Sequence, residues 1–216
     1  MSSPVDYWNR VASEKRFSHP LNLEWLQRAP NSRSPLIVDC GCGYGRTLNE
    51  LQQAGFTNLV GVDFSMAMLS RCRDTCTDPL LICNDGRSLP LRSNSIDVVL
   101  LFAVLTCIPD SSEQLHQIAE VHRILKPNGL IYISDLLINT DERNRERYER
   151  DAARYNCYGV FELPEGVVVR HHQKEWIDEL TGSFEPLEFN RFEVKTMNGN
   201  NSAAFQYLGR KTKFQV

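Results

Sequence analysis

The residues best placed to do chemistry form a glycine-rich turn between two carboxylates. The turn, Asp39-Cys40-Gly41-Cys42-Gly43-Tyr44-Gly45, follows a short apolar run at 36–38, and Asp63 follows the next apolar run, at 58–62. Glycines let the backbone approach a ligand closely, and a carboxylate accepts hydrogen bonds from both hydroxyls of a ribose. A strand, a glycine turn, a helix and a second strand ending in a carboxylate therefore predict a site for a nucleotide-like cofactor.

Two positions in this turn discriminate between cofactors. The dinucleotide fingerprint requires a third glycine three positions after the second, but Arg46 stands there and the glycine comes one place earlier, at Gly45. Asp39 at the start of the turn would repel a pyrophosphate, whereas it suits the ammonium and sulfonium groups of S-adenosylmethionine (SAM). SAM is therefore the expected cofactor, and a nucleotide-dependent oxidoreductase is disfavoured.

Later segments continue the alternation of strands and helices. Strands are expected at 80–83, 95–102 and 130–135, with the turn Asn84-Asp85-Gly86 and the connection Lys126-Pro127-Asn128-Gly129 between them. With these elements the chain resembles the class I SAM-dependent methyltransferase superfamily, in particular its small-molecule branch. The resemblance is close over about residues 36–135 and loose elsewhere.

The resemblance implies a SAM-dependent methyltransferase whose acceptor is a small molecule of unknown identity. It implies that Asp63 binds the ribose hydroxyls, that Gly41 and Gly43 face the methionine part, and that Asp85 meets the adenine amino group with Gly86 beside it. The residues expected at the cofactor are Asp39, Gly41, Cys42, Gly43, Asp63, Phe64, Asp85, Gly86, Phe102 and Tyr7.

The alternating pattern predicts an α/β fold, a Rossmann-like doubly wound sheet with helices on both faces. The sheet is expected to be mostly parallel, with an antiparallel C-terminal hairpin from strands at 188–195 and 203–208 around a turn at Asn198-Gly199. Helices are expected at 44–54, 65–76 (with Ser65 as N-cap), 111–125 and 173–180.

Residues 1–216 are expected to form one methyltransferase domain with two additions. Two short helices within residues 1–30 are expected to act as a lid over the cofactor, with Tyr7 and Trp8 close to it, because aromatic faces attract a sulfonium cation. Residues 136–172 form a long connection that is expected to cap the acceptor pocket.

Composition excludes several other classes. A net charge of −3 and a pI near 6.0 give no overall attraction to nucleic acid or to an anionic membrane. No run approaches membrane-spanning length, and the seven scattered cysteines form no disulfide framework. A cytoplasmic location is therefore expected, without a bound metal, and the oligomeric state stays open.

The segment 141–155 is densely charged, with five arginines and five acidic residues. A basic helix for nucleic acid is one interpretation. The equal numbers of opposite charges favour a solvated helix with pairs such as Glu146 and Arg150.

The acceptor side is expected to come from the end of the capping segment. An aromatic cluster with one cation suits a small, partly apolar acceptor that can be anionic, and the residues expected nearest to it are Tyr158, Phe161, Arg170 and His171, with His171 and Tyr158 as the catalytic candidates. An amine or thiolate acceptor needs no general base, whereas a hydroxyl usually does. Other candidates for a base are His19, His172 and, less favoured, Tyr7, although His171 and His172 are more simply interpreted as paired surface residues.

Two alternatives share the cofactor motifs. A non-catalytic SAM-binding protein that regulates a partner would carry the same turn. A thiol or metalloid methyltransferase would use several of the cysteines Cys40, Cys42, Cys72, Cys76 and Cys107, but no Cys-x-x-Cys spacing with partner histidines supports that alternative.

Overall fold

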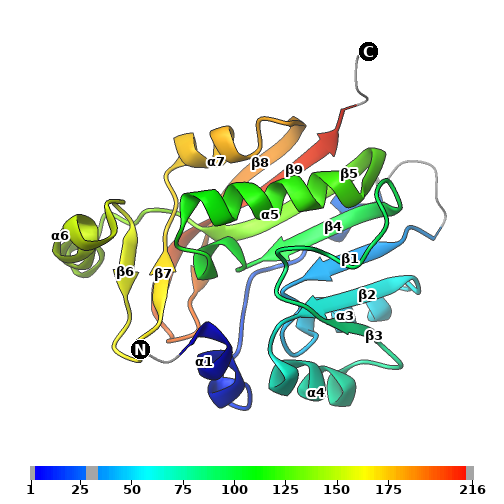
Figure 1. Cartoon of the computed structure of the whole chain (residues 1–216), viewed down its shortest axis with the longest axis horizontal. Coiled ribbons are helices and arrows are strands. Elements are labelled where there is room, and N and C mark those ends of the chain that lie inside the picture. Colours follow the sequence, from blue (N-terminus) through cyan, green and yellow to red (C-terminus); the bar gives the residue numbers. More distant parts are fainter. Residues whose placement is uncertain (1–2, 28–33, 213–216) are drawn as a thin grey trace.

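The computed structural model describes residues 3–27 and 34–212, so residues 1–2 and 28–30 of the expected lid lie outside the described part. A seven-stranded sheet with the order β3-β2-β1-β4-β5-β9-β8 forms its centre (Figure 1). Its strands are β1 (Ile37–Cys40), β2 (Leu59–Asp63), β3 (Leu80–Cys83), β4 (Ile96–Phe102), β5 (Leu125–Leu136), β8 (Phe184–Lys195) and β9 (Asn201–Lys211).

The first five strands are parallel, and β9 runs antiparallel to both β5 and β8. The expected fold, a mostly parallel doubly wound sheet with an antiparallel C-terminal hairpin, is confirmed. The chain winds from β1 outward to β2 and β3, and then returns to place β4 on the other side of β1. Ligands of such sheets bind beyond the carboxyl ends of the strands at this point of reversal.

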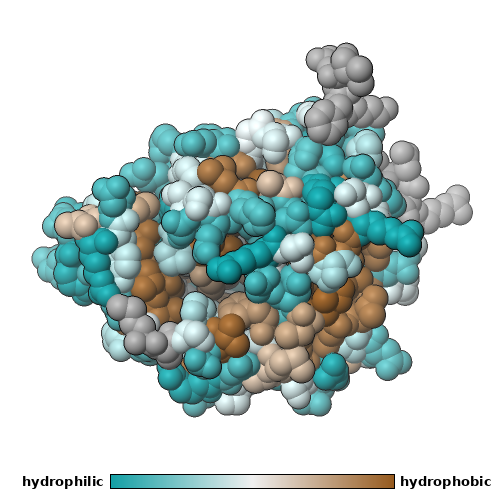
Figure 2. Space-filling model, in the orientation of Figure 1, coloured by the Kyte–Doolittle hydropathy of each residue, from teal (hydrophilic) through white to brown (hydrophobic). Residues whose placement is uncertain are grey.

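Helices cover both faces of the sheet. The helices α5 (Ser111–Ile124) and α7 (Lys174–Leu180) lie on the face seen in Figure 1, while α2 (Leu23–Leu26) and α3 (Arg46–Gln53) pack on the other. The remaining elements are α1 (Pro4–Val11), α4 (Met66–Thr75), η1 (Leu105–Cys107), α6 (Glu142–Tyr155), β6 (Val160–Glu162) and β7 (Val168–Arg170). Polar side chains follow α5 and α6 on the surface, and an apolar strip lies over β6 and β7 beside α1 (Figure 2).

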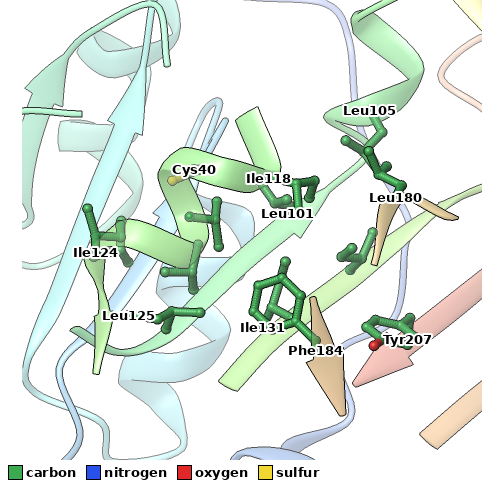
Figure 3. Packing of buried hydrophobic residues seen from close by; sticks show 14 of the residues in the cluster. Cys40, Leu101, Leu105, Ile118, Ile124, Leu125, Ile131, Leu180, Phe184 and Tyr207 are labelled. Carbon is green, nitrogen blue, oxygen red and sulfur yellow. The ribbon is translucent and has the colours of Figure 1, made fainter. Parts of the chain in front are cut away.

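Strand β4 shows why the sheet carries near-continuous apolar runs. Every residue of this strand is buried, since both of its faces are covered. Val99 and Leu101 belong to the cluster under α5 and α7. Figure 3 shows Leu101 in this cluster with Ile131 and Phe184. Val98, Leu100 and Phe102 belong to the cluster on the opposite face.

Residues next to the first turns of α4 and α3 explain where these two helices begin. Ser65 caps α4 as expected, because its Oγ accepts a hydrogen bond from the Met68 amide at 3.2 Å. Helix α3 begins only at Arg46, since Gly45 before it has φ +81°, a left-handed conformation outside the helix. The connection at 126–129 lies inside β5 as an irregularity, with Asn128 at φ 66°.

The addition between β5 and α7 folds into α6 and the antiparallel pair β6–β7, which lie beyond the carboxyl ends of the central strands (Figure 1). The charged helix is confirmed, but its ion pairs differ from the expected one. Arg150 pairs with Asp151 at 2.6 Å rather than with Glu146, and Arg154 reaches Glu162 at 2.7 Å. No helix among the described residues is both long enough and apolar enough to span a membrane.

The interpretation of His171 and His172 as surface residues is wrong, because both side chains are buried. The ring of His172 is held from two sides: its Nδ1 lies 3.0 Å from the Leu136 carbonyl, and its Nε2 lies 3.0 Å from Nε2 of Gln114. Gln114 also donates to the Leu105 and Ile108 carbonyls and accepts from the Trp176 indole at 2.7 Å. One buried amide thus connects η1, α5 and α7 behind the carboxyl ends of the strands.

We expect Gln114→Leu to lower the free energy of unfolding by about 2–4 kcal/mol, because it leaves several buried polar groups without partners. Denaturant unfolding measures the change. Gln53→Leu, at an exposed position of α3, is the matched control and should change stability by less than about 0.5 kcal/mol. Equal effects of the two substitutions would contradict the importance of this network.

Candidate functional site

Two neighbouring pockets, each of about 660 Å³, lie at the carboxyl ends of the central strands. The first, called here the glycine-turn pocket, is lined by Trp8, Phe17, Asp39, Gly41, Cys42, Gly43, Tyr44, Arg46, Thr47, Asp63, Phe64, Met68, Phe102, Ala103, Val104 and Cys107. Seven of the ten residues expected at the cofactor are among them, namely Asp39, Gly41, Cys42, Gly43, Asp63, Phe64 and Phe102.

Glycine is required at two points of the turn. Gly41 has φ +74°, and a Cβ there would lie 2.5 Å from Cγ2 of Val104, across the pocket floor. A Cβ on Gly45 would lie 2.4 Å from Sγ of Cys72 in α4. Both positions therefore demand a residue without a side chain, which keeps the turn flat against β4 and α4.

Asp39 is a buried carboxylate without a hydrogen-bond partner. Asp39 lies within β1 and its side chain is buried, with 1% of the residue exposed. Neither of its carboxylate oxygens has a hydrogen-bond partner among the residues that the structure describes. Burial raises the pKa of Asp39 to about 8, although the nearby Arg46 opposes the rise. A buried polar group in this state is costly, and a cationic donor in the pocket would satisfy it.

Asp63 holds the turn and the start of α4 together. Its Oδ2 accepts from the Gly43 amide at 2.8 Å, and its Oδ1 accepts from the Ser65 amide at 2.8 Å. Burial raises the pKa of Asp63, while these hydrogen bonds oppose the rise. Each oxygen keeps one lone pair for a ligand hydroxyl, so the same carboxylate serves the fold and can serve a ribose.

Asp85 and Gly86 lie beside this pocket rather than in its wall. Asp85 lines a shallower hollow, which shares Phe64 and Cys107 with the glycine-turn pocket. Gly86 packs against α5, where a Cβ would meet Oε1 of Gln117 at 2.6 Å. The hollow that Asp85 lines therefore adjoins the glycine-turn pocket through the shared residues Phe64 and Cys107.

The N-terminal segment closes the other side of the site. Trp8 and Phe17 line the glycine-turn pocket, whereas Tyr7 lies buried behind Trp8 with its ring edge-on at 5.1 Å and does not line the pocket. The segment is fixed to α4, because Arg71 donates to the Ala12 carbonyl at 2.6 Å and stacks over the Tyr44 ring at 4.0 Å.

The second pocket, called here the insertion pocket, lies between the N-terminal segment, the segment at 195–200, and α6 with β6 and β7. It is lined by Trp8, Phe17, Ser18, His19, Ala103, Thr106, Cys107, Leu136, Arg143, Arg147, Phe161, Leu163, Val169, His171, Lys195, Thr196, Met197, Asn198 and Asn200. It shares Trp8, Phe17, Ala103 and Cys107 with the glycine-turn pocket. A ligand in one pocket can therefore meet a ligand in the other.

Two of the four residues expected nearest to the acceptor line this pocket, and two do not. His171 and Phe161 line it. Tyr158 does not, since it is 40% exposed and lies edge-on against Tyr148. Arg170 also lies outside, where it donates to Ser111 Oγ at 3.0 Å and stacks on Trp176.

Sequence reasoning missed the two arginines of the pocket. Arg143 and Arg147 belong to the charged segment interpreted as solvated, but they are four residues apart and so share one face of α6. That face also carries the buried Asn144 and Tyr148. A less polar stripe within the charged helix was the available signal.

The cysteines give no support to the metalloid alternative. Sγ of Cys72 lies 3.9 Å from Sγ of Cys76, and among the described residues no group of three His, Cys, Asp or Glu side chains could hold a metal ion. Burial raises the pKa of the Cys107 thiol, which keeps it neutral at the junction of the two pockets.

The doubly wound sheet, the glycine turn and the two strand-end carboxylates form the arrangement that is typical of domains that bind a nucleotide-like cofactor. Residues 38–133 match the protein family described as "Methyltransferase domain". Over residues 38–133 the chain is therefore similar to methyltransferase domains, and its fold is that of a solved SAM-dependent methyltransferase.

The chain is also similar to a solved structure and to curated proteins that are named as methyltransferases. A SAM-dependent methyltransferase from Methanosarcina mazei has the same fold, with a TM-score of 0.78 and 24% identity, over 87% of this chain and 97% of that one. Methyltransferase-like protein 27 of Homo sapiens is 30% identical over 60% of this chain, and an uncharacterized methyltransferase of Synechocystis is 32% identical over 58%. The matches take in 52% and 57% of the length of these two relatives.

The residues of the glycine-turn pocket fit SAM. Asp39 has no hydrogen-bond partner among the described residues, and the ammonium group of SAM would provide one. Each oxygen of Asp63 accepts one amide hydrogen bond and can accept a second from a ribose hydroxyl. Bound SAM supplies an electrophilic methyl group.

We expect the binding of S-adenosylhomocysteine to tighten from pH 6 to pH 7.5. Asp39 is largely protonated in the free protein below its raised pKa of about 8, and pairing with the ligand ammonium requires the carboxylate. Binding at pH 7 should therefore release a proton, measurable by calorimetry in buffers of different ionisation enthalpy. Asp39→Asn should remove this release and weaken binding about tenfold or more.

Stability gives the control for Asp39. A folded-state pKa raised above the unfolded value means that the free protein loses stability as the pH rises from about 4 towards 8. The melting temperature of Asp39→Asn should lack this part of the decline. If the two proteins have parallel pH profiles, Asp39 does not titrate as described.

We expect Asp63→Ala to weaken binding of S-adenosylhomocysteine at least about tenfold and also to destabilise the protein, because the Gly43 and Ser65 amides lose their acceptor. Ser65→Ala separates the two effects. It removes the cap of α4, at about 1 kcal/mol, and the hydrogen bond from the Ser65 hydroxyl to Asn9, while the Asp63 carboxylate and its two amide donors stay in place. Calorimetry of both folded variants should show a much larger loss of affinity for Asp63→Ala than for Ser65→Ala.

Proposed function

We propose that this chain transfers the methyl group of SAM to a small molecule bound in the insertion pocket. The observation that carries the proposal is the shared wall of the two pockets. Trp8, Phe17, Ala103 and Cys107 line both, so a cofactor in the glycine-turn pocket and an acceptor in the insertion pocket would meet between these residues. Methyl transfer is an in-line displacement that depends mainly on such alignment.

The cofactor contacts belong to the same proposal. Asp39 would bind the ammonium and Asp63 the ribose hydroxyls, while Gly41 and Gly43 would face the methionine part. Asp85 would reach the adenine amino group from the adjoining hollow. Trp8 takes the place expected for Tyr7 as the aromatic residue near the sulfonium.

The site offers only weak bases to an acceptor. Burial lowers the pKa of His19 to about 4 and the pKa of His171 well below its ordinary value, the latter also through Arg147. Both imidazoles are therefore neutral at pH 7 but accept a proton poorly. This favours an acceptor atom whose lone pair is available without a strong base.

A small acceptor is favoured over a large one, although some relatives are named as tRNA methyltransferases, including one of Mus musculus that is 27% identical over 58% of this chain. The insertion pocket is enclosed by the N-terminal segment and by β6 and β7 and is lined by apolar side chains such as Phe161 and Val169. The net charge of −3 gives no general attraction to a polyanion.

A labelling experiment tests the proposal. The protein with SAM carrying a radioactive methyl group is incubated separately with a cell extract below about 1 kDa and with total tRNA. We expect label in the small-molecule extract alone. Met197→Trp, which fills the insertion pocket from its partly buried edge, should reduce labelling at least about tenfold and leave the affinity for S-adenosylhomocysteine unchanged.

Gly41→Ala is the matched variant on the cofactor side, and it should lose that affinity because its Cβ would contact Val104. Label in tRNA would overturn the small-molecule acceptor. Binding of SAM without any labelling would favour a non-catalytic SAM-binding protein instead.

A further inference from the structure

The insertion pocket opens outward through a neck formed by α6. Beyond the neck lies a wider hollow of about 1260 Å³, called here the outer hollow, between α6 and the segments at 162–165 and 198–200. Five residues line both spaces, namely Arg143, Arg147, Leu163, Asn198 and Asn200. Any ligand that reaches the insertion pocket from this side passes the two guanidinium groups.

The charged side chains that line the insertion pocket are all positive. Its charged lining residues are Arg143, Arg147 and Lys195, and no aspartate or glutamate is among the described residues that line it. Three acids line the outer hollow. Glu162 pairs with Arg154 at 2.7 Å and Glu165 with Lys15 at 3.4 Å, while Glu146, next to Arg147 on α6, lines only the outer hollow and not the insertion pocket. The cations at the neck are therefore not matched by protein carboxylates within the pocket.

Arg147 is the least satisfied of these cations. Its guanidinium lies 4.1 Å above the ring of Phe161 and donates from Nη2 to Asn144 Oδ1. Its Nε is buried and has no hydrogen-bond partner among residues 3–27 and 34–212. Burial, followed by the neighbouring Arg143, lowers the pKa of Arg147, so an anion here would relieve both desolvation and repulsion.

Arg143 adds a second cation one helical turn earlier. Its Nε lies 3.9 Å from Asp141, the carboxylate of which already accepts from the amide and side chain of Asn144. The Arg143 side chain is 44% exposed, so it can move towards a ligand in the neck. A guanidinium pair is well suited to a planar or tetrahedral oxyanion.

His171 adds an uncharged polar group on the inner side of the neck, because burial lowers its pKa well below the ordinary value. The Tyr148 hydroxyl lies 2.6 Å from Nδ1 of His171, accepts from the Asn139 amide at 3.3 Å and lies 3.5 Å from Asn144 Oδ1. That hydroxyl can donate to Asn144 while it accepts from the ring, or donate to the ring itself, so both tautomers of His171 satisfy these contacts.

The rest of the wall determines what the anion is attached to. Trp8, Phe17 and Phe161 provide aromatic surface, and Leu136 and Val169 provide aliphatic surface. The junction with the glycine-turn pocket, at Ala103 and Cys107, lies within this apolar part.

We propose that the methyl acceptor carries a compact oxyanion, a carboxylate or a phosphate, which Arg147 and Arg143 bind at the neck while an apolar body extends to the junction with the cofactor. This assignment rests on the proposed function, because it identifies the class of acceptor for the same pocket.

Binding of simple probes tests the assignment. Phenylacetate, phenyl phosphate and the neutral phenylacetamide are titrated into protein saturated with S-adenosylhomocysteine, and affinities are measured by ligand-observed NMR. We expect at least one anion to bind at least tenfold more tightly than the amide. Arg147→Gln should remove this preference, and Arg147→Lys should retain part of it, since the charge remains. Arg145→Gln, at an exposed position of the same helix, should leave it unchanged. The relative affinities of the two anions distinguish a carboxylate from a phosphate site.

Two results would overturn the oxyanion site and differ in what they say of the methyltransferase. If the amide binds as tightly as the anions, or if the preference survives Arg147→Gln, the oxyanion site is wrong, while labelling that is still blocked by Met197→Trp upholds methyl transfer in this pocket. If no probe binds and labelling is insensitive to Met197→Trp, the acceptor lies elsewhere and both proposals fail. The affinity for S-adenosylhomocysteine, expected to be the same in every Arg variant, shows that each variant is folded.

Discussion

A carboxylate buried without a partner is among the most expensive groups a protein can retain, and Asp39 is one. Its position follows from topology. The order of the strands reverses at β1, so the chain leaves a crevice between the turn after β1 and the end of β4. The glycines keep this crevice open, because a Cβ on Gly41 would meet Val104. The free protein thus holds a destabilised acid that a cationic ligand converts into a stabilised ion pair.

Asp63 and the N-terminal segment line the same crevice, but unlike Asp39 they are held in place by hydrogen bonds within the protein. Each oxygen of Asp63 accepts from one backbone amide, so the position of the carboxylate is set by the fold before any ligand arrives. Such preorganisation lowers the cost of ordering on binding. The N-terminal segment is secured through Asn9, which accepts from the Ser65 hydroxyl at 2.8 Å, and through Arg71. Trp8 and Phe17 are consequently fixed where the two pockets meet.

The acceptor side uses opposite electrostatics from the cofactor side. Asp39 and Asp63 provide negative charge for a cationic cofactor, and the arginines of α6 provide positive charge about the neck of the insertion pocket. The residues that both pockets share, Trp8, Phe17, Ala103 and Cys107, are mainly apolar and lie between the two sets of charges. A cofactor with a cationic centre and an acceptor with an anionic end would each be held at its own side of these shared residues.

The sequence by itself determined the fold and most of the glycine-turn pocket, because these depend on residues close together in the chain. The strand, turn and helix around Asp39 and the cap at Ser65 are local. The insertion pocket was decided by tertiary structure. Arg143 and Arg147 reach it, while Tyr158 and Arg170 lie outside, because α6 packs against β6 with one particular face. Nothing in the spacing of residues 141–172 states which face that is. The burial of His171 and His172 also depends on tertiary contacts. Their partners Tyr148 and Gln114 lie 23 and 58 residues earlier in the chain, so the local sequence does not indicate these contacts.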